Sequence, residues 1–226
     1  MIRLLSLLFS IFMSMTAAFG AESLDSILAA RGYVDVSAIS PDILVRLMYA
    51  RDDNFTGHLL YEPEVLSRAW LHPDAAVALG NAQAILTREA SGTRLLVKDA
   101  ARPMSVQRSM FSSVKGTPKA NYVANPAKGG GLHNFGLAVD ITLADARGNE
   151  LPMGTPVDHL GPEANIDREQ QLVRQGVISE TERQNRLLLR RVMMRQAGFR
   201  TIRTEWWHFN LCPLSVARQK YKLIDF

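Results

Sequence analysis

A short apolar strand with a carboxylate at its centre constrains this fold more than any other segment. Residues 137–143 read Leu-Ala-Val-Asp-Ile-Thr-Leu, so that large apolar residues alternate with small or polar ones. This period of two is typical of a half-buried strand. Asp140 falls in the middle of the face that carries the small residues. Because burying an unpaired carboxylate costs several kcal/mol, we expect a cation beside Asp140.

The rest of the chain alternates strand-like and helix-like segments and contains no internal repeat. The second predicted helix is preceded by Ser179 and Glu182, which have the spacing of a capping box. Short strands are predicted at 33–36, 43–49, 95–98 and 204–211, helices at 74–90 and 183–197, and loops at 50–62 and 115–131. The chain has 226 residues, 47% of them hydrophobic, which is enough for one core. We therefore expect a single compact α+β domain, with a small antiparallel sheet and flanking helices.

The N-terminus has the plan of a secretory signal peptide. One positive charge, Arg3, precedes an apolar run from Leu4 to Met15, and small residues follow up to Gly20. The run is about a dozen residues long, shorter than the roughly 20 that a spanning helix needs. We expect residues 1–20 to be removed and the domain at 21–226 to be exported to the periplasm or cell envelope. Membrane contact would then require an uncleaved signal segment.

Charge and cysteine content narrow the classes of partner. The formal net charge is +4, or +3 without Arg3, and the Lys and Arg residues are scattered. Such a mild surplus gives no footprint for nucleic-acid binding. Cys212 is the only cysteine, so an internal disulfide is impossible and stability must come from the core and a metal.

Two pairs of residues carry the candidate chemistry. His133 stands seven residues before Asp140, and His208 stands three residues after Glu205. Each residue alone also has an ordinary structural reading, such as a solvated histidine or a carboxylate that caps a turn. Together, two imidazoles and a carboxylate form a normal zinc site with a fourth position for water, and Glu205 could act as general base. Glu205 and His208 would point to opposite faces of a regular strand, so we expect the strand to begin near Trp206 or to be bulged there.

These motifs closely resemble those of a known family. The stretch His133-Asn-Phe-Gly-Leu-Ala-Val-Asp140, together with Glu205-Trp-Trp-His208, is similar to the metal motifs of the D-alanyl-D-alanine dipeptidases related to the vancomycin-resistance dipeptidase. The resemblance runs through most of the mature chain. It includes Tyr49, residues 54–57, Arg102-Pro103, residues 153–158 and residues 205–209.

The resemblance implies an activity and a role for each site residue. One zinc ion per chain would be held by His133, Asp140 and His208. Glu205 would serve as catalytic base and proton carrier, and Arg102 would stabilise the oxyanion, an interaction suited to a fixed guanidinium. Asp158 would anchor the free amino group of D-Ala-D-Ala, which would be hydrolysed to D-alanine in cell-wall peptide metabolism. From the residues alone, Arg102 could instead form a structural ion pair with Asp99, and Asp158 could cap the segment that follows it.

The chain also departs from the family pattern. Gly131 replaces a serine two residues before the first histidine, Asn134-Phe135 replaces Ser-Arg, and Ala101 replaces an aromatic residue. These changes predict a remodelled pocket. An alternative function is therefore that of a D,D- or L,D-carboxypeptidase or endopeptidase that acts on the stem peptides of peptidoglycan. A non-catalytic zinc domain is a further alternative. Cys212 could close the metal site as a fourth ligand or, as free cysteines commonly do, pack as a small hydrophobe.

Overall fold

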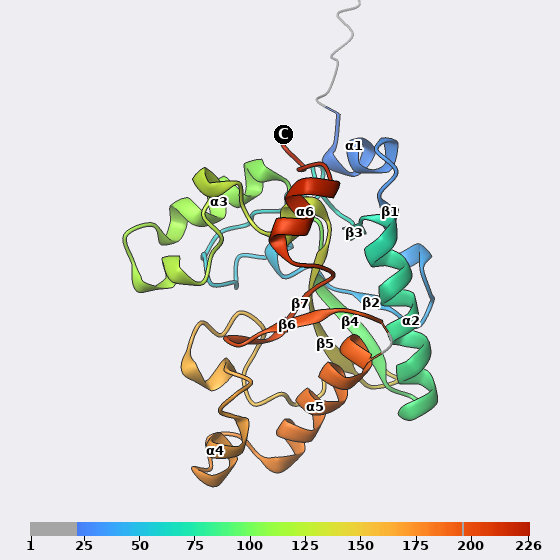
Figure 1. Cartoon of the computed structure of the whole chain (residues 1–226), viewed down its shortest axis with the longest axis vertical. Coiled ribbons are helices and arrows are strands. Elements are labelled where there is room, and N and C mark those ends of the chain that lie inside the picture. The colour runs from blue at the N-terminus through green and yellow to red at the C-terminus, as the bar shows by residue number, and fades with distance from the viewer. Residues whose placement is uncertain (1–21, 196) are drawn as a thin grey trace, which may run out of the picture.

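In the part of the chain that the structure describes, helices surround a central mixed sheet, so the predicted α+β fold class is confirmed. The structure, a computed structural model, describes residues 22–195 and 197–226, so the predicted signal peptide at 1–20 lies outside the described residues (Figure 1). The helices are α1 (Leu24–Ala30), α2 (Pro73–Glu89), α3 (Met104–Val114), α4 (Glu169–Arg174), α5 (Glu180–Arg195) and α6 (Leu214–Lys220). None of the helices in the described ranges is long and apolar enough to span a membrane.

A five-stranded sheet forms the centre of the domain. Its strand order is β2-β4-β5-β7-β6. The strands are β2 (Leu44–Val45), β4 (Arg94–Asp99), β5 (Ala138–Ala144), β7 (Glu205–Asn210) and β6 (Arg200–Ile202). The sheet is mixed, because β2 pairs with β4 in parallel while the other pairs are antiparallel. A separate antiparallel pair, β1 (Val34–Asp35) with β3 (Trp70–Leu71), completes the strands of the described chain.

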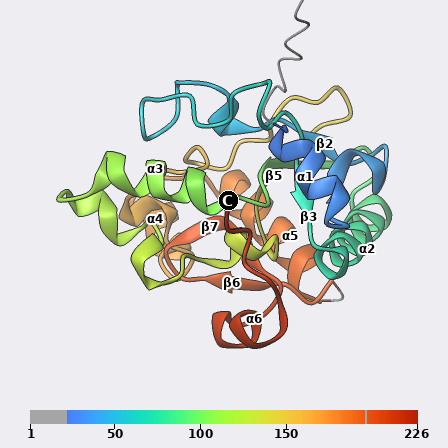
Figure 2. The same cartoon turned by 90° about the horizontal axis from the view of Figure 1, so that it is seen from above.

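The helices are arranged around this sheet. Helices α2 and α5 contact each other and also contact the central strands, so they cover the same face. Figures 1 and 2 place α2 and α3 on opposite sides of the molecule, with the sheet strands between them. The capping box predicted for α5 is confirmed, because the Ser179 N–H and hydroxyl both bond the Glu182 carboxylate and the Glu182 N–H bonds the Ser179 hydroxyl.

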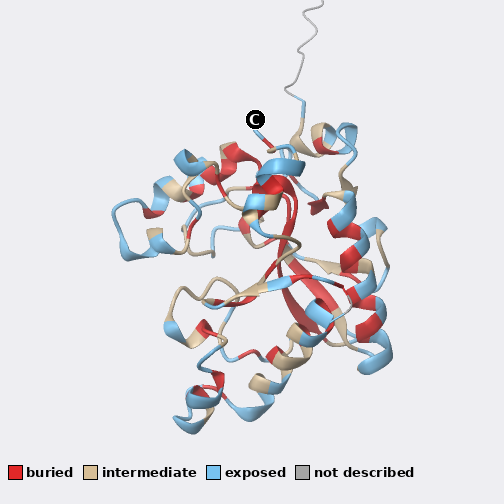
Figure 3. Ribbon diagram, viewed as in Figure 1, coloured by how far each residue is buried: buried red, intermediate tan, exposed pale blue. Residues whose placement is uncertain are grey.

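The predicted half-buried character of residues 137–143 is wrong. All seven residues of β5 are buried (Figure 3). The strand lies between β4 and β7, and segments outside the sheet cover the face that carries Asp140. One of these segments is the 3-10 turn Leu132–Phe135, which contacts β5 directly. Asp140 at the middle of this strand is only 3% exposed, which strengthens the requirement for a compensating cation.

Two other predictions need correction. The strand predicted at 43–49 is reduced to Leu44–Val45, and a 3-10 turn forms at Met48–Ala50. Helix α3 was not predicted from this serine-rich sequence, although five of its eleven residues are apolar. It nevertheless forms after Pro103 and buries one side, including Met104 and Met110. The segment at 115–131 is irregular as predicted, apart from two short 3-10 turns.

Candidate active site

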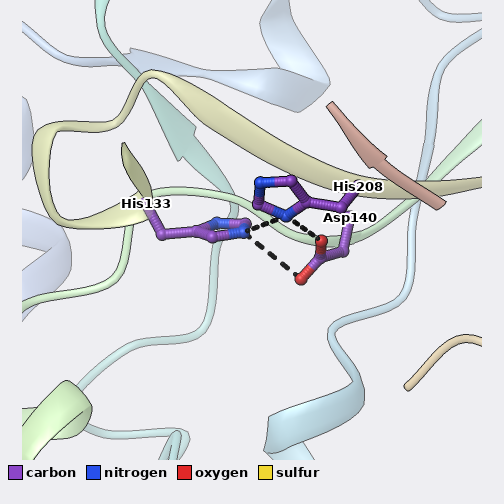
Figure 4. A group of neighbouring side chains, drawn as sticks. All are labelled: His133, Asp140 and His208. Carbon is purple, nitrogen blue, oxygen red and sulfur yellow. Dashed lines mark hydrogen bonds and ion pairs between the residues drawn. The ribbon is translucent and has the colours of Figure 1, made fainter. Parts of the chain in front are cut away.

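Three predicted ligands lie together beside the central strands. Asp140 on β5 and His208 on β7 are register partners, and His133 belongs to the 3-10 turn that precedes β5. Figure 4 shows the three side chains pointing toward one another. The His208 Nδ1 atom lies 2.9 Å from Asp140 Oδ1, and His133 Nε2 lies 3.3 Å from Asp140 Oδ2. One ligand atom from each residue falls within 4.8 Å of the others, so the group could hold a metal ion.

Gly136 makes this placement of His133 possible. It ends the 3-10 turn with φ of +67°, and its N–H bonds the His133 carbonyl at 3.0 Å. Glycine adopts this left-handed conformation without steric cost. A Cβ atom at this position would also approach the Tyr33 ring to 2.5 Å. The glycine therefore lets the chain reverse direction between His133 and β5.

Hydrogen bonds to the far nitrogen of each imidazole fix its orientation. His133 Nδ1 lies 2.7 Å from the Ala100 carbonyl oxygen, and His208 Nε2 lies 2.9 Å from Asn210 Oδ1. Both oxygens accept hydrogen bonds, so these two nitrogens donate and the other nitrogen of each ring is directed into the site. These inner nitrogens, His133 Nε2 and His208 Nδ1, lie 3.3 Å apart beside the Asp140 carboxylate, and a metal ion would replace any proton that they carry. Such a set of donors fits a metal ion, because each histidine ligand has the outer hydrogen bond that metal-binding histidines normally make.

Glu205 begins β7 and lies on the same side as His208. The two ionisable groups are 3.9 Å apart, between Glu205 Oε2 and His208 Nδ1. The predicted bulge accounts for this arrangement: neighbouring residues Thr201 and Ile202 of β6 pair with Phe209 and Glu205, so the register jumps within β7. The strand itself begins at Glu205, within the predicted range 204–211.

The surroundings of Glu205 suit a group that accepts and returns protons. The pKa of Glu205 is raised to about 7, mainly by burial; the Asp140 carboxylate contributes to the rise, while His208 and Arg102 oppose it. A general base is most effective when its pKa lies near the working pH. The carboxylate is thus poised for proton transfer at neutral pH.

Arg102 lies in the site and also forms the ion pair that was its alternative reading. Its Nε atom lies 3.0 Å from Asp99 Oδ2, and its Nη2 atom bonds the same oxygen. Asp99 is fully buried and also accepts a hydrogen bond from the Tyr61 hydroxyl at 2.6 Å. The two readings are compatible, because the ion pair holds the guanidinium with its Nη2 atom 3.8 Å from Asp140 Oδ2.

Asp158 lies in an irregular segment on another side of the site. Its φ of +65° is the one positive value for a non-glycine residue within the described chain. The Tyr49 hydroxyl donates a hydrogen bond to its Oδ2 atom. Burial raises the pKa of Asp158 to about 8, and the Asp140 carboxylate contributes to the shift. The family resemblance included Tyr49 without a role for it. This hydrogen bond indicates that Tyr49 orients the Asp158 carboxyl group.

One cavity of about 610 Å³ brings the predicted residues together. All six predicted site residues line it, namely Arg102, His133, Asp140, Asp158, Glu205 and His208. Gly131, where the family pattern has serine, lines it as well. Cys212 is half-buried and does not belong to the group that could hold a metal. A second cavity of about 660 Å³ adjoins the first and shares Phe55, Asp158 and Leu160 with it.

Several residues that support the site were not predicted from the sequence. Tyr61, Asn210 and the Ala100 carbonyl lie next to the site, yet none of them stands in a motif that signals its contact. Asp99 was visible only as a possible ion-pair partner three residues before Arg102. These contacts join segments that are far apart along the chain, and local spacing cannot reveal them.

Comparison with known proteins gives a consistent result. A family model described as D-ala-D-ala dipeptidase matches residues 29–224. A D-alanyl-D-alanine dipeptidase of Escherichia coli (strain K12) is 35% identical over 178 residues, which cover 79% of this chain and 83% of that protein. A D-alanyl-D-alanine dipeptidase of Enterococcus faecalis (strain ATCC 700802 / V583) is 31% identical over 183 residues, covering 72% and 83% respectively.

Proposed function

The chain belongs to the D-Ala-D-Ala dipeptidase family of peptidases, and we propose that it is a zinc-dependent enzyme that hydrolyses the D-Ala-D-Ala dipeptide to D-alanine. The observation that carries this proposal is one cavity, which is lined by the candidate metal ligands and by the other three predicted site residues, Arg102, Asp158 and Glu205. The names of the two relatives support the choice of substrate.

The donor set of the site suits zinc. His133, Asp140 and His208 would supply two nitrogens and one oxygen, and three protein ligands are typical of catalytic zinc sites. When bound, zinc would supply Lewis-acid activation of water and of the scissile carbonyl. The hydrogen bonds from His133 to Ala100 and from His208 to Asn210 hold both rings in the orientation that this role needs.

Two further residues would carry the proton and the developing charge. Glu205, with its pKa near 7, accepts a proton from the attacking water and delivers it to the amine that leaves. Arg102 is held by Asp99 and directs its guanidinium into the cavity, where it can stabilise the tetrahedral oxyanion. Donors that are fixed before the reaction are effective at this task because they need no reorganisation.

Asp158 would bind the free amino group of the dipeptide. The Tyr49 hydroxyl orients its carboxyl group, and the group lines the cavity together with Glu205. An ammonium group within contact distance favours the charged form of a carboxylate. Binding of the dipeptide therefore lowers the pKa of Asp158 and completes the ion pair.

A carboxypeptidase that acts on wall peptides is the second candidate. The adjoining cavity shares Asp158 with the first, so a substrate that extends past Asp158 has a space to enter. This candidate differs from the first in one respect: it does not require a free amino group.

Release of D-alanine by the zinc-loaded protein tests the proposal. The substrates are D-Ala-D-Ala and N-acetyl-D-Ala-D-Ala, and the control is the Glu205→Gln variant. We expect turnover of the free dipeptide alone, lost in the variant. Cleavage of the blocked substrate would favour the carboxypeptidase. Failure to cleave either substrate, with zinc bound, would contradict the proposal.

We also propose that the protein acts outside the cytoplasm, in cell-wall peptide metabolism. The signal-like plan of residues 1–20 supports this location. N-terminal sequencing of the protein recovered from the cell envelope should begin near Ala21. An intact N-terminus in a cytoplasmic fraction would contradict the location without affecting the proposed activity.

A further inference from the structure

One buried arginine outside the active site holds the segment that carries Asp158. Arg186 lies on α5, and its side chain has no exposed surface. Its Nε atom donates to the Met153 carbonyl at 2.6 Å, and its Nη1 atom donates to the Glu163 carbonyl at 3.0 Å. These two carbonyls stand five residues before and five residues after Asp158. A single guanidinium therefore fixes both ends of the Asp158 segment, residues 153–163.

The backbone at Asp158 needs such support. A non-glycine residue with φ of +65° is strained, and strained conformations persist only where the surrounding structure holds them. The segment contains no regular element except one 3-10 turn, Pro162–Ala164. Hydrogen bonds from α5 therefore replace the support that a helix or strand would give. Asn185, next to Arg186, adds a bond to the Pro152 carbonyl at 2.8 Å.

The same arginine is linked to the strand that carries Glu205. Its Nη2 atom donates to the Thr155 hydroxyl oxygen at 3.3 Å, and that oxygen also accepts a bond from Trp206 Nε1 at 2.8 Å. The guanidinium carbon lies 5.4 Å from the centroid of the Trp206 ring. Trp206 follows Glu205 directly. Arg186 thus connects the segment of Asp158 with the first residues of β7.

We propose that Arg186 is a positioning residue, which fixes the place of Asp158 relative to Glu205. On the proposed function, on which this inference rests, Arg186 thereby determines how well the enzyme binds substrates with a free amino group. Its three bonds use the planar fork of the guanidinium, which points fixed donors in several directions. A lysine keeps the charge but cannot direct donors to Met153 and Glu163 in the same geometry. Glu169 lies 4.0 Å from Nη1 and forms its shorter ion pair with Arg190, at 2.6 Å.

The test compares Arg186→Lys with Arg190→Lys in the zinc-loaded protein. Arg190 lies on the same helix and bonds Glu169 with both Nη atoms, so its replacement disturbs a partly buried ion pair without touching the Asp158 segment. Thr155→Val is a milder second variant, which keeps the Met153 and Glu163 bonds and carries the test if Arg186→Lys does not fold. The measurements are kcat and KM for D-Ala-D-Ala, the inhibition constant of N-acetyl-D-Ala-D-Ala, bound zinc, and amide hydrogen exchange over residues 153–163.

For Arg186→Lys we expect KM for D-Ala-D-Ala to rise on the order of tenfold, as for a weakened hydrogen bond to a charged group, with a smaller change in kcat. The inhibition constant of the blocked dipeptide and the zinc content should stay constant, while exchange in residues 153–163 becomes faster. Unchanged exchange would overturn the inference, as would a fall in kcat alone with KM constant. If the wild-type protein cleaves neither substrate, the proposed function fails, whereas exchange still decides whether Arg186 holds the Asp158 segment.

Discussion

Asp140 and His208 are register partners on the two neighbouring strands β5 and β7, and their side chains meet at 2.9 Å between Oδ1 and Nδ1. Two of the three candidate ligands are thus placed by the central pairing of the sheet, the most deeply buried part of the fold. Only His133 depends on a turn. The sheet therefore places two of the ligands, and the turn that ends at Gly136 places the third.

Replacing Asp140 by asparagine should weaken zinc binding. The change removes the only negative charge from the ligand group, so we expect affinity to fall by about 100-fold or more, beyond the usual effect of an outer contact. The measurement is the number of zinc ions that remain bound per chain after dialysis. Asp145→Asn, in the exposed turn after β5, is the matched control and should retain one zinc. Equal zinc retention by both variants would refute the assignment of Asp140.

Glu205→Gln should separate zinc binding from catalysis. The amide cannot accept the proton, so turnover of D-Ala-D-Ala should fall by about 10² to 10⁴, the usual contribution of a general base. Zinc content should remain that of the wild type, because Glu205 lies outside the ligand group. Glu150→Gln, at an exposed ion pair with Arg46, should keep full turnover. Normal activity in Glu205→Gln would exclude its role as base.

Zinc should stabilise the fold. Binding to the native state alone adds about 2.7 kcal/mol when free zinc is 100 times its dissociation constant. We therefore expect thermal unfolding to shift upward with zinc and downward with a chelator, as followed by calorimetry. The His133→Ala variant should show no such shift. A zinc-induced shift of equal size in that variant would indicate binding elsewhere.

Asp99→Asn should damage both stability and catalysis. The change leaves the Arg102 guanidinium buried without its charged partner, and breaking a buried pair in this way costs about 3–5 kcal/mol. Urea unfolding gives the stability, and kcat should also fall because Arg102 loses its fixed position. Glu150→Gln breaks two pairs at the surface, with Arg46 and with Lys98, each of which should contribute about 1 kcal/mol or less. Similar losses in the two variants would mean that Asp99 does not hold Arg102 in place.

Asp25 should make stability depend on pH. Burial alone would raise the pKa of this carboxyl, but hydrogen bonds from Trp70, Ser67 and Arg68 outweigh that effect and lower it below 3.8. Because the folded pKa is below the unfolded one, the contribution is full above about pH 4 and disappears as pH falls through the lower folded value. The difference in urea midpoint between wild type and Asp25→Asn should therefore be larger at pH 7 than at pH 3. A constant difference would contradict this account.

Local features of the sequence determined the fold class, the main elements and the six candidate residues. Helix α2 and strand β5 follow from the spacing of apolar residues, which reports the period of each element directly. The metal group was recognisable because His133 and Asp140, and likewise Glu205 and His208, stand in short motifs whose chemistry is specific. The expected bulge in β7 also followed from spacing, since a regular strand would separate Glu205 from His208.

Only the tertiary structure decided how these parts are supported. It buried β5 on both faces, formed α3 from a serine-rich segment, and brought Tyr61 to Asp99 and Arg186 to the ends of the Asp158 segment. Each of these outcomes depends on contacts between residues far apart along the chain. Periodicity and motif spacing describe the neighbours of a residue in sequence, whereas burial and hydrogen bonding depend on its neighbours in space.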